Sequence, residues 1–450
     1  MHRRRFFSIA SGSLAGLVAA KAQSAQKQRH VVIVSIDGFG ASAMRDAGVP
    51  LPTLRRLAQE GASADAMQVV NPSVTWPNHT SMVTGVAPAK HSVLYNGLAV
   101  RGGEGEPLRV EPWLDKDVLV KAPTLYDAAH AAGLTTAQVD WVAIQNAKTI
   151  TWEFPERPRV EGGIEREMIV AGLVSEEEIR GFAKAPIVWR DEIWTRAGIH
   201  LIEKHRPNLL LFHLLTTDSA QHRYGAGSLA GNTAMALADS KVERLLDALR
   251  AAGIFDRTTV FIVADHGFKT YRHVIHPNAF LRRNGHLRDR DGKLDCDAWV
   301  IPEGGTAMVY ATRRKMKPEI VRKLAAEFSK LEGVARVIAP SDFDALGYPQ
   351  PESNDRMADL VLAAAEGYAF DAVHTGEPVT EVSAGSSPGA HGYLNSDPDM
   401  NASFIAWGSG IKPGVKLGTM RNLDIAPTVA KILGLQMGNV AGRVLDEILE

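Results

Sequence analysis

The chain has 450 residues, of which 45% are hydrophobic and 22% are charged, a composition typical of one large globular α/β domain with insertions or of two domains. Its 50 basic and 51 acidic side chains give a net charge of −1, so no overall charge directs it to a nucleic acid polymer or to an anionic membrane. A single cysteine, Cys296, excludes an internal disulfide framework and a cysteine-based metal cluster, which leaves His, Asp and Glu as candidate ligands.

The first 28 residues have the pattern of an export signal. Arg3-Arg4-Arg5-Phe6-Phe7 precedes an apolar run diluted by Ser and Gly, and Ala20-Lys21-Ala22 offers a cleavage site of small residues. This pattern resembles a twin-arginine signal, which predicts a periplasmic or secreted protein without a stable membrane anchor. The alternative is an uncleaved anchor, but a bilayer span needs about 20 apolar residues. We therefore expect residues 29–450 to form the folded part.

The folded part begins with a strand and reaches its most informative segment within 60 residues. HVVIVSIDGFG (30–40) is a nearly continuous apolar run that ends in Asp37-Gly38, which predicts a buried parallel strand with a functional carboxylate at its carboxyl end. A helix over 53–60 leads to a strand-like run over 67–70. In NPSVTWPNHTSMVTG (71–85), Thr75 lies where this strand gives way to a helix over 78–84. The N-terminus of a helix favours an anion, so a phosphate-like group is expected beside the Thr75 hydroxyl.

Strands and helices then alternate, as expected of a parallel sheet. A loop over 86–98 contains Asn96, and it precedes a helix over 124–132 and a strand over 135–141. Residues 142–190 mix aromatics, prolines and charges without one period, which predicts an insertion over the sheet edge rather than a core element. A helix over 191–205, a strand over 208–215, a helix over 229–251 and a strand over 258–264 follow. The two strands end in Thr216-Thr217-Asp218 and in Asp265-His266-Gly267.

A second insertion is expected near 268–375. Asp291-Gly292 predicts a hairpin, and strands over 306–311, 334–338 and 359–364 with a helix near 318–331 predict a smaller α+β region. A loop rich in Gly and Ser (382–400), a strand over 403–408 and a closing helix over 424–434 complete the chain. The sequence thus predicts one α/β catalytic domain over 29–450, with insertions near 142–190 and 268–375.

The polar residues at the strand ends and in the glycine-rich loop are all able to bind a metal; they are Asp37, Thr75, Asp218, His222, Asp265, His266 and His391. Asp218 and His222 are four residues apart, which places both side chains on one face of a helical turn, as a chelating pair requires. His391 lies between Ala390 and Gly392, small neighbours that allow a loop to approach a metal closely. Each residue alone is a weak signal, but together they predict a metal centre.

The order and context of these residues resemble the alkaline phosphatase superfamily, and more closely its nucleotide pyrophosphatase/phosphodiesterase branch, also called type I phosphodiesterases. The matching segments are VVIVSIDGFG, SVTWPNHTSMVTG, TTDSAQHRYG, FIVADHGF, GAHGYLNSDPDM and LDIAPTVAKILGL. The resemblance implies a three-layer, doubly wound, mostly parallel sheet with a smaller cap-like α+β region. It also implies two Zn²⁺ ions, in place of which other divalent ions are possible.

The resemblance further implies a role for each site residue. Asp37, Asp265 and His266 would bind one ion together with Thr75. Asp218, His222 and His391 would bind the other ion. Thr75 would be the nucleophile, forming a phosphothreonine that is then hydrolysed, and the Asn96 amide would contact a phosphate oxygen. Two divalent ions suit such an in-line displacement because one activates the attacking oxygen and the other stabilises the leaving oxygen.

The residues near Thr75 bear on the substrate. The phosphomonoesterase branch with a threonine nucleophile adds a Lys-x-Arg pair, which is absent between Thr75 and Asp218; Lys148 and Arg157-Pro158-Arg159 are imperfect substitutes. We therefore predict a small phosphodiester as substrate. Trp76 would either stack on a planar leaving group such as a nucleobase or pack against the sheet.

Several alternatives stay open. They are a phosphomonoesterase, a phosphonoacetate-type hydrolase, and a metal-binding export protein without activity, which the intact site disfavours. Four further histidines have no ligand partner at a useful spacing, so we interpret them as structural; they are His79, His91, His213 and His374. Nucleotide, lipid and choline-phosphate esters are not distinguished, and the oligomeric state is left open.

Overall fold

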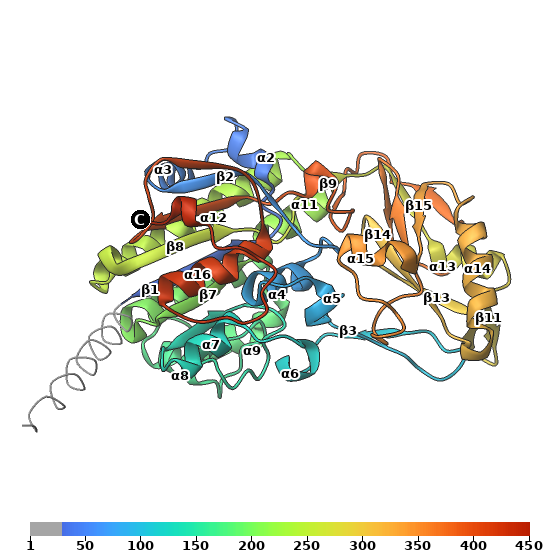
Figure 1. Cartoon of the computed structure of the whole chain (residues 1–450), viewed down its shortest axis with the longest axis horizontal. Coiled ribbons are helices and arrows are strands. Elements are labelled where there is room, and N and C mark those ends of the chain that lie inside the picture. Colours follow the sequence, from blue (N-terminus) through green and yellow to red (C-terminus); the bar gives the residue numbers. More distant parts are fainter. Residues whose placement is uncertain (1–28) are drawn as a thin grey trace, which may run out of the picture.

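The computed structural model describes residues 29–450, so the expected export signal lies outside the described residues. The described chain forms two lobes (Figure 1). The larger lobe contains an eight-stranded sheet, and the smaller lobe contains a four-stranded sheet. Across the described residues, no helix combines the length and the apolar character that crossing a membrane requires.

The eight-stranded sheet is mostly parallel, with β20 as its antiparallel member. Its order and bounds are β21 (Val415–Arg421), β2 (Ala62–Gln68), β20 (Phe404–Gly408), β8 (Thr258–Val263), β1 (His30–Ile36), β7 (Leu209–Leu214), β5 (Thr136–Val139) and β6 (Trp152–Phe154). The central strands β8, β1 and β7 are buried at every position. Because helices cover both faces of such a strand, its sequence is apolar throughout instead of alternating, as the sequence predicted for 30–40.

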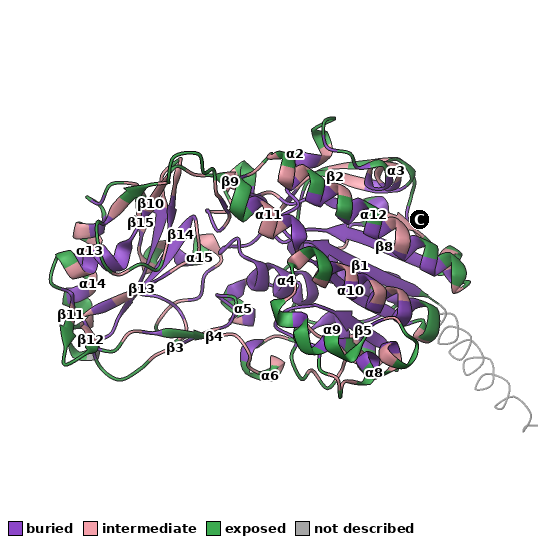
Figure 2. Cartoon of the chain, turned by 180° about the vertical axis from the view of Figure 1, so that it is seen from behind, coloured by how far each residue is buried: buried purple, intermediate pink, exposed green. Residues whose placement is uncertain are grey.

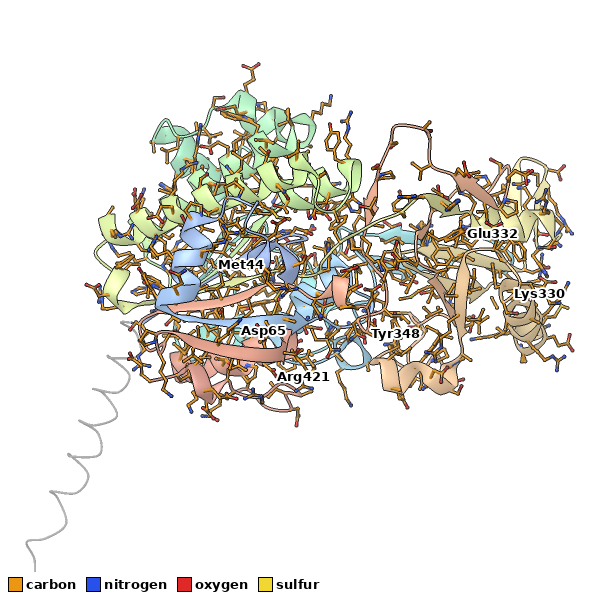
Figure 3. The ribbon with its side chains drawn as sticks, turned by 90° about the horizontal axis from the view of Figure 1, so that it is seen from above. Met44, Asp65, Lys330, Glu332, Tyr348 and Arg421 are labelled. Atoms are coloured by element: carbon orange, nitrogen blue, oxygen red, sulfur yellow. The ribbon has the colours of Figure 1, made fainter. Side chains whose placement is uncertain are left out.

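Two layers of helices enclose this sheet. One face packs against α3 (Pro52–Glu60), α10 (Ile187–His200) and α12 (Leu229–Ala251), and the other against α4 (Thr75–Thr84), α7 (Leu125–Ala131) and α16 (Ile425–Leu433). Viewed from above, helices lie on either side of the sheet (Figure 3). The strands between them are buried along most of their length (Figure 2). This arrangement confirms the predicted three-layer α/β fold.

The smaller lobe confirms the predicted α+β region. Its sheet has the order β13 (Ala298–Pro302), β14 (Thr306–Ala311), β16 (Leu360–Ala364) and β15 (Val334–Ile338), and α14 (Lys317–Phe328) packs on it. The expected hairpin is formed by β11 (Leu287–Arg290) and β12 (Lys293–Cys296), where Asp291 and Gly292 adopt φ values of 52° and 76°. Beside these lie β10 (His273–Ile275), β17 (Tyr368–Phe370), β18 (Val379–Glu381) and α13 (Pro277–Arg283).

A cluster of tyrosines joins the two lobes. Tyr95, from the segment after α5 (Pro88–His91), packs with Tyr310 and Tyr348 of the smaller lobe, and its hydroxyl bonds to that of Tyr310. Tyr348 lies where the lobes meet, whereas Lys330 and Glu332 lie at the outer part of the smaller lobe (Figure 3). The smaller lobe is therefore packed against the segment that contains Asn96.

The stretch 142–190 differs from its prediction. It supplies β6 to the edge of the main sheet, together with α8 (Gly163–Val170) and α9 (Glu176–Gly181). Phe154, Met168 and Phe182 are buried in the main core, so the expectation that this stretch contains no core element is wrong. The reason is length: a strand of three residues and two short helices are too brief to show a period.

Several boundaries also differ. Helix α4 begins at Thr75 rather than at 78, and β2 spans Ala62–Gln68 rather than 67–70. The helix expected over 191–205 is α10 followed by a π-helical turn, η2 (Leu201–His205).

Candidate active site

The seven candidate ligands lie at one edge of the main sheet. Asp37 follows β1, Asp265 and His266 follow β8, and Asp218 and His222 lie in α11 (Thr216–Tyr224) directly after β7. These three strands are neighbours and parallel, so their carboxyl ends meet at the same edge. Thr75 opens α4 beyond β2, and His391 follows β19 (Gly389–Ala390), which pairs with β9 (Lys269–Thr270).

The first group consists of Asp37, Asp265 and His266. Nε2 of His266 lies 3.3 Å from Oδ1 of Asp37 and 3.2 Å from Oδ2 of Asp265. All three side chains are buried, and each offers one ligand atom within 4.8 Å of the others. The hydroxyl of Thr75 lies 3.5 Å from the same Nε2, so it faces this group.

The second group consists of Asp218, His222 and His391. Oδ1 of Asp218 lies 3.3 Å from Nε2 of His222 and 3.7 Å from Nε2 of His391. The imidazoles of His391 and His266 are stacked, with centroids 3.6 Å apart. The two groups are therefore in contact through their histidines.

Hydrogen bonds orient all three histidines in the way that metal ligands require. Nδ1 of His222 donates to the carbonyl of Gly389 (3.1 Å), Nδ1 of His266 to that of Gly267 (3.1 Å), and Nδ1 of His391 to that of Ser73 (3.2 Å). A carbonyl accepts only, so the proton lies on Nδ1 and the Nε2 lone pair faces the site. Burial lowers the pKa of His266 to about 4, which keeps this imidazole neutral at pH 7.

The carboxylates of the site lack sufficient partners within the protein. Across the described residues, Oδ1 of Asp37, Oδ1 of Asp218 and Oδ2 of Asp265 are buried without a hydrogen-bond donor. Burial and the nearby charges of Asp265 and Asp218 raise the pKa of Asp37 well above its usual range. A cation reverses this repulsion, so the donor set and its unpaired oxygens fit bound divalent ions.

Helix α4 positions Thr75. All ten residues of this helix are buried, and Thr75 is its first residue, where the backbone N–H has no acceptor within the helix. The Asn78 side chain accepts from the N–H of Val70 (2.8 Å) and donates to the carbonyl of Val74 (2.8 Å). These bonds tie the loop before the helix to its first turn, which fixes the Thr75 backbone.

Asn96 and Trp76 flank Thr75. Oδ1 of Asn96 accepts from the N–H of Trp76 (2.9 Å), which leaves the Nδ2 donors of Asn96 on the exposed side. Trp76 lines a cavity of about 280 Å³ together with Trp113, Trp141 and Arg157. The guanidinium of Arg157 lies 3.5 Å above the Trp113 ring. The cavity is thus aromatic, has a cation beside it, and is lined by the residue that follows the candidate nucleophile.

The loop of His391 depends on a glycine. Gly392 has a φ of +79°, and a Cβ built there would lie 1.6 Å from the carbonyl oxygen of Glu303. The N–H of Gly392 donates to the carbonyl of Ser73 (3.0 Å), which holds the loop beside the segment that leads to Thr75.

His213, which we interpreted as structural, contacts a carboxylate of the site. Its Nε2 donates to Oδ2 of Asp37 (3.1 Å), and its Nδ1 lies 3.2 Å from Oδ2 of Asp140. Burial alone would lower the pKa of His213, but the two carboxylates raise it well above its usual value. Sequence spacing missed this contact because His213 belongs to β7, whereas Asp37 follows β1. The available signal was a lone imidazole inside an otherwise apolar central strand.

His79 also lies beside the first group. Its Nδ1 donates to the carbonyl of Thr75 (2.9 Å) and lies 3.8 Å from Oδ2 of Asp265. His91 is buried, bonding to Ser81 (2.9 Å), as expected of a structural histidine.

Comparisons with known proteins show the family of this chain. The family model for type I phosphodiesterase/nucleotide pyrophosphatase matches residues 31–394. An uncharacterized pyrophosphatase/phosphodiesterase of Schizosaccharomyces pombe is 25% identical over 91% of this chain and 77% of its own length. Ectonucleotide pyrophosphatase/phosphodiesterase family member 7 of Rattus norvegicus is 22% identical over 96% of this chain and 90% of its own.

Solved structures support the same fold. Murine ectonucleotide pyrophosphatase/phosphodiesterase 5 has a TM-score of 0.71 at 18% identity, covering 94% of this chain and 100% of that one. An inactive threonine-to-alanine variant of that protein, in complex with AMP, has a TM-score of 0.70. The fold is therefore of the alkaline phosphatase type, as predicted. The chain belongs to the type I phosphodiesterase/nucleotide pyrophosphatase family and is a metal-dependent hydrolase of phosphodiester bonds.

Proposed function

We propose that the protein is an exported phosphodiesterase/nucleotide pyrophosphatase that uses two metal ions and a phosphothreonine intermediate on Thr75. The observation that carries the proposal is the position of the Thr75 hydroxyl, at the first residue of α4 and 3.5 Å from Nε2 of His266 in the first group of ligands. A hydroxyl at its ordinary pKa is a poor nucleophile. A metal ion held by these ligands would activate it by lowering its pKa.

Two zinc ions fit the donor sets best. Asp37, Asp265 and His266 would hold one ion together with Thr75, and the second group of Asp218, His222 and His391 would hold the other. Carboxylate and imidazole donors suit zinc and also accept other divalent ions. When bound, such ions lower the pKa of the attacking hydroxyl and stabilise the charge on the leaving oxygen.

Thr75, Asn96 and Trp76 would each have a role in the hydrolysis of the phosphodiester. The Thr75 hydroxyl loses its proton as its oxygen attacks phosphorus, and the bond to the leaving alcohol or nucleoside monophosphate breaks as the leaving oxygen gains a proton. Water then cleaves the bond between Thr75 and phosphorus, which releases a phosphate monoester and returns a proton to Thr75. The Nδ2 group of Asn96 and the backbone N–H of Thr75 would donate to phosphate oxygens, where negative charge accumulates. Trp76 would contact a planar group of the substrate from the aromatic cavity.

A nucleotide substrate is supported by the AMP complex of the murine relative and by the aromatic cavity next to Thr75. Export through the twin-arginine route and a single catalytic domain over 29–450 complete the proposal. A phosphomonoesterase is the second candidate, because Arg157 and Arg159 both line the cavity and are the available cations for a dianionic phosphate.

The Thr75→Ala variant tests the nucleophile. We expect it to retain the fold and both metal ions but to lose turnover of phosphodiesters. Asp218→Ala serves as the matched control, since it should lose one metal equivalent. Substantial diesterase activity in Thr75→Ala would falsify the assignment of the nucleophile.

A further inference from the structure

A third cluster of metal-capable side chains lies away from the candidate active site. It consists of Glu167 in α8, His200 at the end of α10, and His205 at the end of η2. The ring of His205 packs at a tilt of 34° against that of Trp152, the first residue of β6, and η2 ends four residues before β7 begins. This cluster therefore adjoins the amino ends of β6 and β7, whereas the candidate active site lies at the carboxyl ends of the strands.

The π-helical turn is what brings the two histidines together. His205 lies five positions after His200, and in a continuous α-helix of 3.6 residues per turn their side chains would diverge by about 140°. In η2 the N–H of Arg206 instead bonds to the carbonyl of Leu201 (3.0 Å), five residues back. This wider turn places residues five apart on nearly the same face, and π-turns of this kind occur often at functional sites.

The two imidazoles converge on one carboxylate oxygen. Nε2 of His200 lies 3.0 Å and Nε2 of His205 lies 2.8 Å from Oε2 of Glu167. In the two groups of the candidate active site the corresponding distances are 3.2–3.7 Å. The third cluster is therefore as compact as the candidate catalytic groups. His200 is 8% exposed and Glu167 is partly exposed, so the cluster is sheltered but reachable by a solvated ion.

We propose that Glu167, His200 and His205 bind a divalent transition metal of the zinc class, at a site separate from the catalytic centre. Two imidazole nitrogens and one carboxylate oxygen suit Zn²⁺ and its neighbours rather than Mg²⁺ or Ca²⁺, which prefer oxygen donors. Three protein ligands leave further positions of the ion to water. The bound ion ties α8, which belongs to the segment 142–190, to the end of α10.

One cation competes with a metal for this carboxylate. Nζ of Lys204 lies 3.3 Å from Oε2 of Glu167, but its side chain is 57% exposed. A flexible, exposed lysine can turn to solvent, so the metal displaces it at a small cost. If the cluster is instead only an ion pair, Lys204 and a protonated histidine are its stabilising partners.

Metal stoichiometry decides between these two cases. Mature protein is stripped with a chelator, re-equilibrated with Zn²⁺ and freed of excess ion, and its zinc content is measured by mass spectrometry. We expect one equivalent more in the parent than in the double variant His200→Gln/His205→Gln, with diesterase activity equal in both. Asp218→Ala, as the matched control, loses an equivalent together with activity. Equal zinc content in parent and double variant overturns the proposal, whatever the number of catalytic ions.

A single substitution of the competing cation provides a second test that does not depend on removing a ligand. Lys204→Met should bind the additional zinc more tightly than the parent in a competition titration with a chelator, because it removes the competing charge. If Lys204→Met binds no more zinc than the double variant, the cluster is only an ion pair and the proposal is overturned.

Discussion

The side-chain amide of Asn96 offers a sharp test of how the site stabilises the transition state. Oδ1 of Asn96 accepts from the N–H of Trp76 (2.9 Å), and among residues 29–450 its Nδ2 has no acceptor. The free donor is thus directed away from the backbone that Oδ1 supports. Asn96→Ala removes both functions, whereas Asn96→Asp keeps the acceptor for Trp76 and replaces the donor by a negative charge.

The structure permits an estimate for each variant. Loss of one donor to developing charge costs about 2.7–4 kcal/mol in enclosed sites, and the exposed position of Asn96 favours the lower end, about a hundredfold in kcat. A carboxylate about 4 Å from an anionic phosphate in a water-like medium costs about 1 kcal/mol more, which is a further factor of about five. We therefore expect Asn96→Asp to be slower than Asn96→Ala.

The assay is kcat/KM on bis-p-nitrophenyl phosphate, with metal content measured on the same samples. Which of the two variants has the higher kcat/KM shows whether Asn96 donates to the phosphate or only supports the backbone of Trp76. If Asn96 acts only by supporting the backbone of Trp76, Asn96→Asp retains that contact and is the faster variant. That order, or an Asn96→Ala rate within about threefold of the parent, would refute the reasoning, since one catalytic donor is worth far more.

Three other predictions concern metal binding and stability. His213→Leu should weaken metal binding at the Asp37 group by about 10–100-fold in a chelator titration, because outer partners orient ligands. Gly392→Ala should lower both the melting temperature and the metal content, whereas Gly376→Ala, also at positive φ but in open space, should retain its metal. Burial would raise the pKa of Glu192, but bonds to arginine and lysine lower it from 4.5 to about 2. The Glu192 carboxylate therefore stabilises the fold above pH 4.5, and this stabilisation is lost as the pH falls to 2. Glu192→Gln should lower the free energy of unfolding by about 1–2 kcal/mol at pH 7, measured by urea unfolding. The difference in this free energy between parent and variant should shrink between pH 4.5 and pH 2. An unchanged difference at low pH would contradict this assignment.

The sequence was most informative about the central strands of the main sheet and about the polar residues that directly follow them. The apolar run over 30–40 predicted a buried parallel strand, and polar residues directly after parallel strands must lie at one edge of the sheet. The positions of Asp37, Asp218 and Asp265 followed from this reasoning. His391 was selected as a candidate ligand because its neighbours Ala390 and Gly392 are small, and the family resemblance assigned it to the same ion as Asp218 and His222.

The parts that the sequence did not reveal depend on contacts between distant segments. His213 and Asp140 approach Asp37 only because β7 lies between β1 and β5, and sheet order is not visible in local patterns. The strand β6 is too short to have a period. Likewise, the expected helix over 191–205 concealed the π-helical turn, since a helical pattern does not distinguish bonds between residues four apart from bonds between residues five apart.

The most direct test of the central claim compares kcat/KM of the zinc-loaded mature protein on bis-p-nitrophenyl phosphate and on p-nitrophenyl phosphate, with thymidine 5′-monophosphate p-nitrophenyl ester as a third substrate. We predict a large preference for the two diesters and a further gain with the nucleotide, since Trp76 lines the adjoining cavity. A preference for the monoester would contradict the account, because it would mean that a cation such as Arg157 reaches the phosphate and that the protein is a phosphomonoesterase.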